Sequence, residues 1–189
     1  IYSDKSYYYV TVQGGDGKRI VDMTQPTTSA TTTISTFDDN KFHEVDEINI
    51  QKLGRIWFGE NLSVNNDQEF VFNFPNLVNT SPIIVDTHIA AVTSTYNNFK
   101  IEANSQLVGN IAITPSPSSN VLVFERTLSS PVTVNSDNVT IKITYDNSGV
   151  PSSKGYLDYI NIKTKRNLRA YGKQFSFQFD QHNNFEKKV

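Results

Sequence analysis

The feature that most constrains this fold is a series of short β-patterned runs separated by turn residues. The clearest run is "QEFVFNFPNL" (68–77), in which Phe70, Phe72 and Phe74 take every second position. Alternation with this period predicts a strand with one buried face. Pro75 ends that strand or places it at a sheet edge, because proline cannot donate to a β-ladder.

Runs of the same kind recur along most of the chain. The segments between them, "NND", "NSQ", "TPSPSS", "SSP", "NSD" and "NSGVPSSKG", have the composition of turns and loops. Many short strands at this spacing predict an all-β chain, folded as an antiparallel β-sandwich of jelly-roll type. The expected strands are 55–64, 68–77, 82–94, 98–104, 106–113, 120–128, 132–135, 138–146, 155–168 and 173–179.

The N-terminal part has a different pattern. Two β-branched and aromatic runs, "SYYYVTVQ" (6–13) and "KRIVDM" (18–23), flank the glycine-rich "GGDG". This arrangement predicts a hairpin. Residues 24–36 are rich in threonine and predict a linker, or a long loop that ends in a strand.

The stretch 37–53 fits two local structures. Val45, Ile48 and Leu53 have the spacing of a short helix, whereas Ile48 and Ile50 alternate as in a strand. Both interpretations stay open at this point.

A weak domain boundary falls at residues 24–42. We therefore expect residues 1–36 to be a hairpin and Thr-rich segment that belongs to a preceding module, and residues 37–189 to be the sandwich. The sequence begins at Ile1 and shows no signal peptide, so we interpret it as an excerpt from a larger protein.

The composition excludes several classes of function. Cysteine is absent, which rules out disulfides, thiolate metal sites and a cysteine nucleophile within these residues. A net charge of −2 gives no electrostatic reason to expect nucleic acid as a partner. No apolar stretch reaches the roughly 18 residues that a membrane-spanning helix needs. Abundant Ser, Thr and Asn, with 12% aromatic residues, favour an exported β-module.

Catalytic residues are not evident. The sequence has no G-x-S-x-G elbow, and its three histidines, His43, His88 and His182, lie far apart in different contexts. Because catalytic side chains must converge in space, we interpret these histidines as ordinary surface or strand residues and expect no catalytic residue in this chain.

No metal site or cofactor is expected either. The segments "DGK" (16–18), "FDDN" (37–40) and "HEVDE" (43–47) supply oxygen ligands, but none matches a calcium-binding EF-hand loop. A calcium ion at a loop of the sandwich is the alternative. The basic run "KTKRNLR" (163–169) is interpreted as a solvated face, with a phosphate or an anionic glycan as the alternative contact.

Aromatic residues raise the possibility of glycan binding, since jelly-roll modules often bind sugars through exposed rings. Most of the aromatic residues here alternate with apolar ones, which makes packing in the core the commoner explanation. The candidates are Trp57, Tyr7, Tyr8, Tyr9, Tyr96, Tyr156 and Tyr159.

Three blocks together carry a resemblance to a known family: "KFHEVDEINIQKLGRIWFGENL", "FVFNFPNLV" and "GYLDYINIKTKRNLRAYGKQFSFQ". They resemble the region that precedes the peptidase domain in PorU-type proteins. These are the gingipain-like cysteine peptidases that act as sortases of the type IX secretion system in Bacteroidetes. The blocks "GRIWFGE" and "GYLDYI…YGKQFSF" are the most specific parts of the match, whereas residues 95–150 add little.

The resemblance implies a host protein on the outer-membrane surface that cleaves the C-terminal signal of cargo and attaches the cargo to anionic lipopolysaccharide. The family's catalytic cysteine and histidine have no counterpart here. The resemblance therefore implies an accessory, non-catalytic domain whose partners are the downstream peptidase domain, cargo and anionic lipopolysaccharide. A glycan-binding module is the alternative function.

Six residues are the expected structural positions. In "GRIWFGE", Gly54 and Gly59 allow a bulge or a close backbone approach, and Arg55 and Glu60 pair or hold a loop. Trp57 is expected to pack as an anchor between the sandwich and a neighbouring segment.

The sixth position lies in the run "GYLDYINIKTK". Alternation places Asp158 on one face with Tyr156, Ile160 and Ile162. An acid among apolar neighbours needs partners, so we expect backbone N–H groups, a lysine or an arginine to hold Asp158.

Overall fold

The computed structural model of this chain describes residues 5, 7–12, 14–22, 24, 27, 34–52, 56–63, 66–115, 123–170 and 172–178. The chain divides into two compact units, 1–33 and 34–189. In the first unit the described residues form neither helix nor strand, and Tyr8, Tyr9 and Val10 are at least 88% exposed. The expected hairpin is therefore not formed by these residues. A lone two-stranded hairpin is marginal in water because it buries too little apolar surface.

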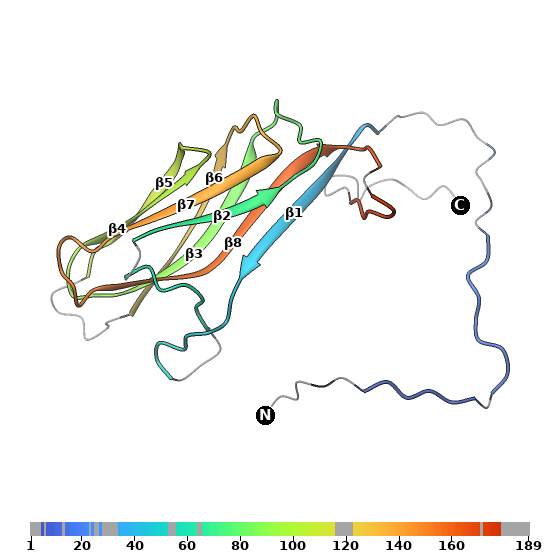
Figure 1. Cartoon of the computed structure of the whole chain (residues 1–189), viewed down its shortest axis with the longest axis horizontal. Coiled ribbons are helices and arrows are strands. Elements are labelled where there is room, and N and C mark those ends of the chain that lie inside the picture. Colours follow the sequence, from blue (N-terminus) through green and yellow to red (C-terminus); the bar gives the residue numbers. More distant parts are fainter. Residues whose placement is uncertain are drawn as a thin grey trace. The chain divides into compact units, whose positions relative to one another are not determined.

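The second unit is built from β-strands and confirms the all-β expectation (Figure 1). No helix of the described residues is long and apolar enough to cross a bilayer. The strands are β1 (Thr36–Glu44), β2 (Asp67–Asn73), β3 (Ile83–Val92), β4 (Asn97–Ala103), β5 (Gln106–Ile113), β6 (Val123–Val132), β7 (Asn138–Asp146) and β8 (Lys154–Asn167).

The strands form two packed four-stranded sheets. The first sheet has the order β1-β8-β3-β6 and the second has the order β2-β7-β4-β5, with every pairing antiparallel. Successive strands therefore alternate between sheets for most of the chain, which is the jelly-roll arrangement predicted from sequence. β1 and β2 are the terminal strands of the two sheets on the same side of the sandwich (Figure 1).

The core lies between the sheets and follows the alternation in the strands. In β7, Val139, Ile141, Ile143 and Tyr145 point inward and are at most 1% exposed, whereas the residues between them face solvent. The Tyr145 hydroxyl donates a hydrogen bond of 2.7 Å to the side-chain oxygen of Asn97, which is also fully buried. This bond satisfies two polar groups that would be costly to bury unpaired.

Strand β6 runs through the segment that was expected to be a turn. It continues across "SSP" to Val132, and Pro131 pairs with Ile84 of β3. Proline is tolerated here because β6 is the terminal strand of its sheet, so the missing N–H removes no bond to a further strand.

The stretch 37–53, for which helix and strand were both open, contains all of β1 except Thr36, and no helix among its described residues. The expected strand 55–64 is also wrong: its described part makes only isolated bridges, Ile48 with Phe58 and Asn61 with Tyr156. The expected strand 173–179 makes one bridge, between Gln178 and Asp38.

Candidate functional site

The candidate site lies where β1 ends against the middle of β8. β1 pairs with β8 as far as Glu44 opposite Tyr159. Beyond that point the segment 59–62 takes over the same edge, because the Gly59 N–H donates to Leu157 O at 2.8 Å. Two chain segments therefore meet at one short stretch of β8.

β8 carries a bulge at this junction. His88 of β3 pairs with Tyr159, and the next β3 residue, Ile89, pairs with Leu157, so Asp158 has no residue opposite it. An extra residue in one strand shifts the alternation of side chains by one position. Inserted residues of this kind are common next to functional sites.

Because of the bulge, the side chains of β8 do not lie on the faces expected from simple alternation. Tyr156 packs in a small second cluster with Phe58, whereas Ile160 and Ile162 belong to the main core between the sheets. The expectation that all three share one face with Asp158 is therefore wrong. The alternation in the sequence gave no sign of the insertion.

Asp158 is nearly buried and is held by a histidine. Its Oδ2 accepts a hydrogen bond of 2.5 Å from His88 Nδ1, and the two side chains are 12% and 13% exposed. Glu125 Oε2 lies 4.0 Å from the other ring nitrogen of His88. We expected backbone N–H groups, a lysine or an arginine to hold Asp158. The structure shows that the partner is a histidine, His88.

Two more acids surround Asp158. Carboxylate oxygens of Glu44, Asp46 and Asp158 lie within 4.8 Å of one another. These are the described side chains that could hold a divalent cation, although exposed acidic groups of this kind are common without one. Burial, and then the charges of Asp46 and Asp158, raise the pKa of Glu44 above its usual range.

Replacing Glu44 with glutamine is expected to raise stability at neutral pH and leave it unchanged at low pH. A carboxyl with a raised pKa in the folded state stabilises the fold while it is protonated. That contribution is lost as the pH rises through the folded-state pKa. Urea unfolding between pH 4 and pH 7 checks this. A wild-type advantage that grows toward neutral pH contradicts it.

The two described histidines, His43 and His88, are each paired with carboxylates. Both ring nitrogens of His88 face carboxylates, and His43 instead pairs with Glu60 at 2.7 Å and packs its ring on Phe70 at 4.7 Å. Among the contacts of the described residues, no hydroxyl lies within hydrogen-bonding distance of either ring. His182 falls outside the described residues.

The "GRIWFGE" block is only partly described, because Gly54 and Arg55 lie outside the described residues. Trp57 is 43% exposed, so the expectation that it packs is wrong for this chain. Phe58, at 2% exposure, packs instead, since its bridge to Ile48 turns alternate side chains of this segment in opposite directions. We expected Trp57 to be the packed residue, whereas its neighbour Phe58 is the buried one.

Gly59 and Glu60 tie this segment to the end of β1. A Cβ at Gly59 would lie 2.6 Å from Val45 O, closer than atoms can approach, so the backbones meet here only because the residue is glycine. Glu60 pairs with His43 through Oε1, while its other oxygen is buried without a hydrogen-bond partner among the described residues.

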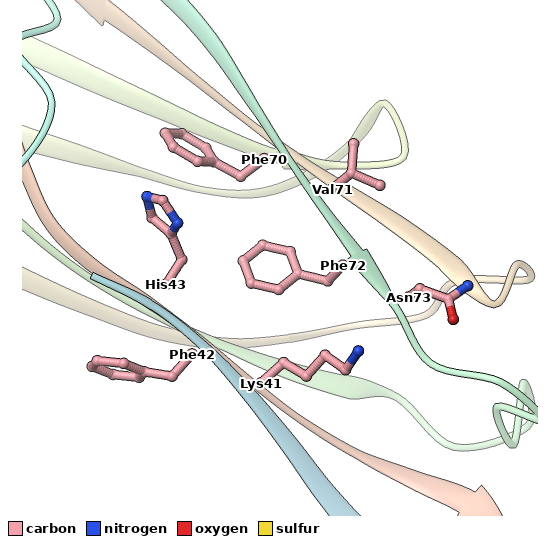
Figure 2. Close-up of a pocket in the computed structure, with 7 residues that line it drawn as sticks. All are labelled: Lys41, Phe42, His43, Phe70, Val71, Phe72 and Asn73. Carbon is pink, nitrogen blue, oxygen red and sulfur yellow. The ribbon is translucent and has the colours of Figure 1, made fainter. Parts of the chain in front are cut away.

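A groove opens between the two terminal strands beside this junction. Its volume is about 360 Å³, and it is lined by Lys41–His43 of β1 and Phe70–Asn73 of β2 (Figure 2). Figure 2 shows His43 and Phe72 pointing into the gap between the strands, while Val71 and Asn73 point away from it. We call this feature the edge groove.

The basic run 163–169 is largely neutralised. Lys163 lies 2.9 Å from Asp86, Lys165 lies 2.6 Å from Asp38, and Arg166 lies 2.7 Å from Asp39. These ion pairs argue against an anion site, because the three positive charges already have carboxylate partners. The solvated-face interpretation fits the exposed Lys163, whereas Arg166 is buried at 9% exposure.

No family model matches the chain, and no curated protein matches it in sequence. Among solved structures, dimeric latent PorU from Porphyromonas gingivalis is similar in fold, with a TM-score of 0.67 and 20% identity. The match covers 81% of this chain and 15% of that protein, so the chain spans a small part of the PorU polypeptide. At this identity the likeness shows the fold.

Carbohydrate-binding modules match more loosely. The CBM36-1 domain of a multidomain xylanase, from the hindgut metagenome of Trinervitermes trinervoides, has a TM-score of 0.44 and 12% identity over 71% of this chain and 99% of that one. A family 35 module from Clostridium thermocellum has a TM-score of 0.37 and 15% identity over 67% and 90%.

Proposed function

We propose that this chain is a non-catalytic accessory β-sandwich domain of a gingipain-like sortase of the PorU type, acting in type IX secretion. The observation that carries the proposal is the fold similarity to one part of PorU, which extends over 81% of this chain. In this proposal the sandwich positions the peptidase domain that follows in the same polypeptide, and also positions cargo. Residues 1–36 belong to the preceding module, and the protein is exported to the outer-membrane surface of a Bacteroidetes-type bacterium.

The chemistry of the chain supports an accessory role. The sequence has no cysteine, so a thiol nucleophile must come from another domain. Each described histidine is held by a carboxylate, at 2.7 Å for His43 and 2.5 Å for His88. These contacts suit a structural role, because the first ties the end of β1 to the segment 59–62 and the second ties β3 to β8.

The test compares the parent polypeptide with a version that lacks residues 34–178. We expect the deletion to reduce cleavage and transfer of a C-terminal signal substrate by at least about tenfold, because a positioning defect commonly costs this much. The isolated chain is expected to show no turnover. A deletion variant that folds and keeps full activity contradicts the proposal, as does turnover by the isolated chain.

Glycan binding is the second candidate, and one contact favours it. Phe42 of β1 stacks on Tyr159 of β8 with ring centroids 5.3 Å apart, and Phe42 is 53% exposed. The pair lies beside the Glu44, Asp46 and Asp158 carboxylates, which offer hydrogen-bond acceptors. Sugar-binding sites commonly combine apolar or aromatic surface with a few polar groups.

Affinity electrophoresis in gels that contain lipopolysaccharide tests the second candidate. We expect retardation of the wild-type chain and its loss in Phe42→Ala, with Tyr96→Ala as the matched control, because Tyr96 is exposed to a similar degree at 49%. Equal mobility of all three proteins with and without glycan rejects glycan binding at this site.

A further inference from the structure

The outer edge of β1 is a strand edge with unused backbone groups. Asp38 N donates to Gln178 O at 2.9 Å, so the peptide groups of Asp38 point away from β8. Backbone direction alternates along an antiparallel strand, which gives Asn40, Phe42 and Glu44 the same outward direction. Among the described residues, no backbone partner is found for the outward groups of these three.

This edge already accepts an extended chain at one end. The bridge between Asp38 and Gln178 is antiparallel and places one residue of the C-terminal segment in register with β1. The unused edge, from Asn40 to Glu44, continues directly from that bridge. It is about 17 Å long at the usual rise per residue, which matches a peptide of about five or six residues.

The side chains beside this edge determine which charge a bound strand must carry. Lys41 points into the edge groove, where its Nζ lies 5.6 Å from the centroid of the Phe74 ring (Figure 2). Among the described residues, no carboxylate lies within ion-pair distance of it, whereas the neighbouring His43 is paired with Glu60. A strand added to β1 places one of its side chains directly opposite Lys41.

We propose that the β1 edge from Asn40 to Glu44 docks an extended peptide by strand addition, and that the peptide carries an acidic side chain opposite Lys41. Backbone hydrogen bonds supply the attachment, and the edge groove supplies the specificity, as in other cases of strand addition. The residues that flank the acid are apolar or β-branched, because they lie beside Phe42 and the phenylalanines of β2. The inference goes beyond the proposed accessory function and does not depend on it.

A second copy of the chain fits this edge less well. Gln178 occupies the Asp38 position, so symmetric pairing of two β1 strands that uses the whole edge from Asn40 to Glu44 centres on Phe42. That register places Lys41 of one copy opposite His43 of the other, and His43 is already paired with Glu60, so Lys41 gains no acid directly opposite it. An unpaired lysine on an edge strand opposes pairing of identical edges, and selects a partner that brings the opposite charge.

The test uses the full chain and a fluorescein-labelled, capped peptide of about six valine and threonine residues with one internal aspartate. A twin peptide carries lysine in place of the aspartate. We expect saturable anisotropy changes with the aspartate peptide below about 1 mM, and at least about tenfold weaker binding of the twin. Failure of both peptides to bind at that concentration overturns the proposal, as does equal binding of the two.

Three variants locate the binding. Asn40→Pro removes an outward N–H and leaves the bonds to β8 intact, so we expect it to abolish binding with little change in melting temperature. Lys41→Glu is expected to reverse the preference between the two peptides. The control Lys100→Glu alters a lysine on the second sheet, paired at 2.7 Å with Glu102, and is expected to bind as wild type does.

Unchanged binding by Asn40→Pro overturns the proposal, since the outward backbone groups are then not used. Loss of preference in Lys100→Glu to the same extent as in Lys41→Glu also overturns it, because the effect is then one of net charge. Concentration-dependent dimerisation in sedimentation, abolished by Asn40→Pro, assigns the edge to a second copy of the chain instead of a peptide.

Discussion

Replacing Tyr145 with alanine is expected to lower the free energy of unfolding by about 3–5 kcal/mol, the usual cost of truncating a core aromatic residue. Tyr145 is 1% exposed, and its ring lies 4.7 Å from that of Phe99. The substitution also leaves the buried Asn97 side chain without the hydroxyl that bonds to it. The Tyr145 ring packs directly on the backbone of Gly155 in the facing sheet. Glycine has no side chain that could move into the cavity left by the substitution, so we expect the cavity to stay open.

The matched variant Tyr145→Phe separates packing from hydrogen bonding. It keeps the ring and removes the 2.7 Å bond to Asn97, so we expect a smaller loss of about 1–3 kcal/mol. Urea unfolding, followed by circular dichroism, measures both variants. Equal losses for alanine and phenylalanine contradict the packing argument, because the ring then contributes nothing beyond its hydroxyl.

Alkaline titration gives an independent check on Tyr145. Burial, and then the charge of Asp146, raises its pKa to about 12. A raised pKa in the folded state contributes stability that is complete below the unfolded-state value. That contribution is lost as the pH rises through the folded-state value. Wild type is therefore expected to lose stability between pH 10 and about 12, and Tyr145→Phe to lose less over the same range.

The strands that could be predicted from sequence are those with one face in the core. In β7 every second residue from Val139 to Tyr145 is buried, so hydrophobic periodicity shows the strand directly. β1 has no such period, because Phe37 is its single residue below 9% exposure. Its pairing with β8 depends on tertiary contacts, and the sequence therefore left helix and strand open.

The candidate site was harder to predict than the fold. The bulge at Asp158 adds one residue to β8 without leaving a sign in its composition. Simple alternation therefore assigned Ile160 and Ile162 to the same face as Asp158, which is wrong. His88 and Asp158 are 70 residues apart, and no local pattern links them. Trp57 was misjudged because residue size favours burial, whereas the bridge between Ile48 and Phe58 decides which side chain turns inward.

Replacing Asp158 with asparagine is expected to lower the free energy of unfolding by about 1 kcal/mol. The amide keeps a hydrogen bond to His88, so the loss is that of weakening one bond in a fold that stays packed. The substitution also removes a negative charge beside Glu44 and Asp46, which offsets part of the loss. Unfolding of this variant in urea measures the net effect.

Replacing His88 with alanine is expected to cost about 3 kcal/mol. The substitution leaves the nearly buried Asp158 carboxylate without its partner and close to two other acids. Breaking a buried pair from one side typically costs about 3–5 kcal/mol. The lower end applies because the two side chains stay 12% and 13% exposed.

A double-mutant cycle shows whether the missing partner explains the cost of losing His88. In the His88→Ala background, Asp158→Asn removes the stranded charge, so we expect it to restore at least about 1 kcal/mol although it is destabilising alone. Lys100→Glu, on the far sheet, is the matched control and is expected to add independently to His88→Ala. If His88→Ala and Asp158→Asn are additive within about 0.5 kcal/mol, the two side chains are not coupled, and the cost of losing the imidazole reflects the cavity it leaves.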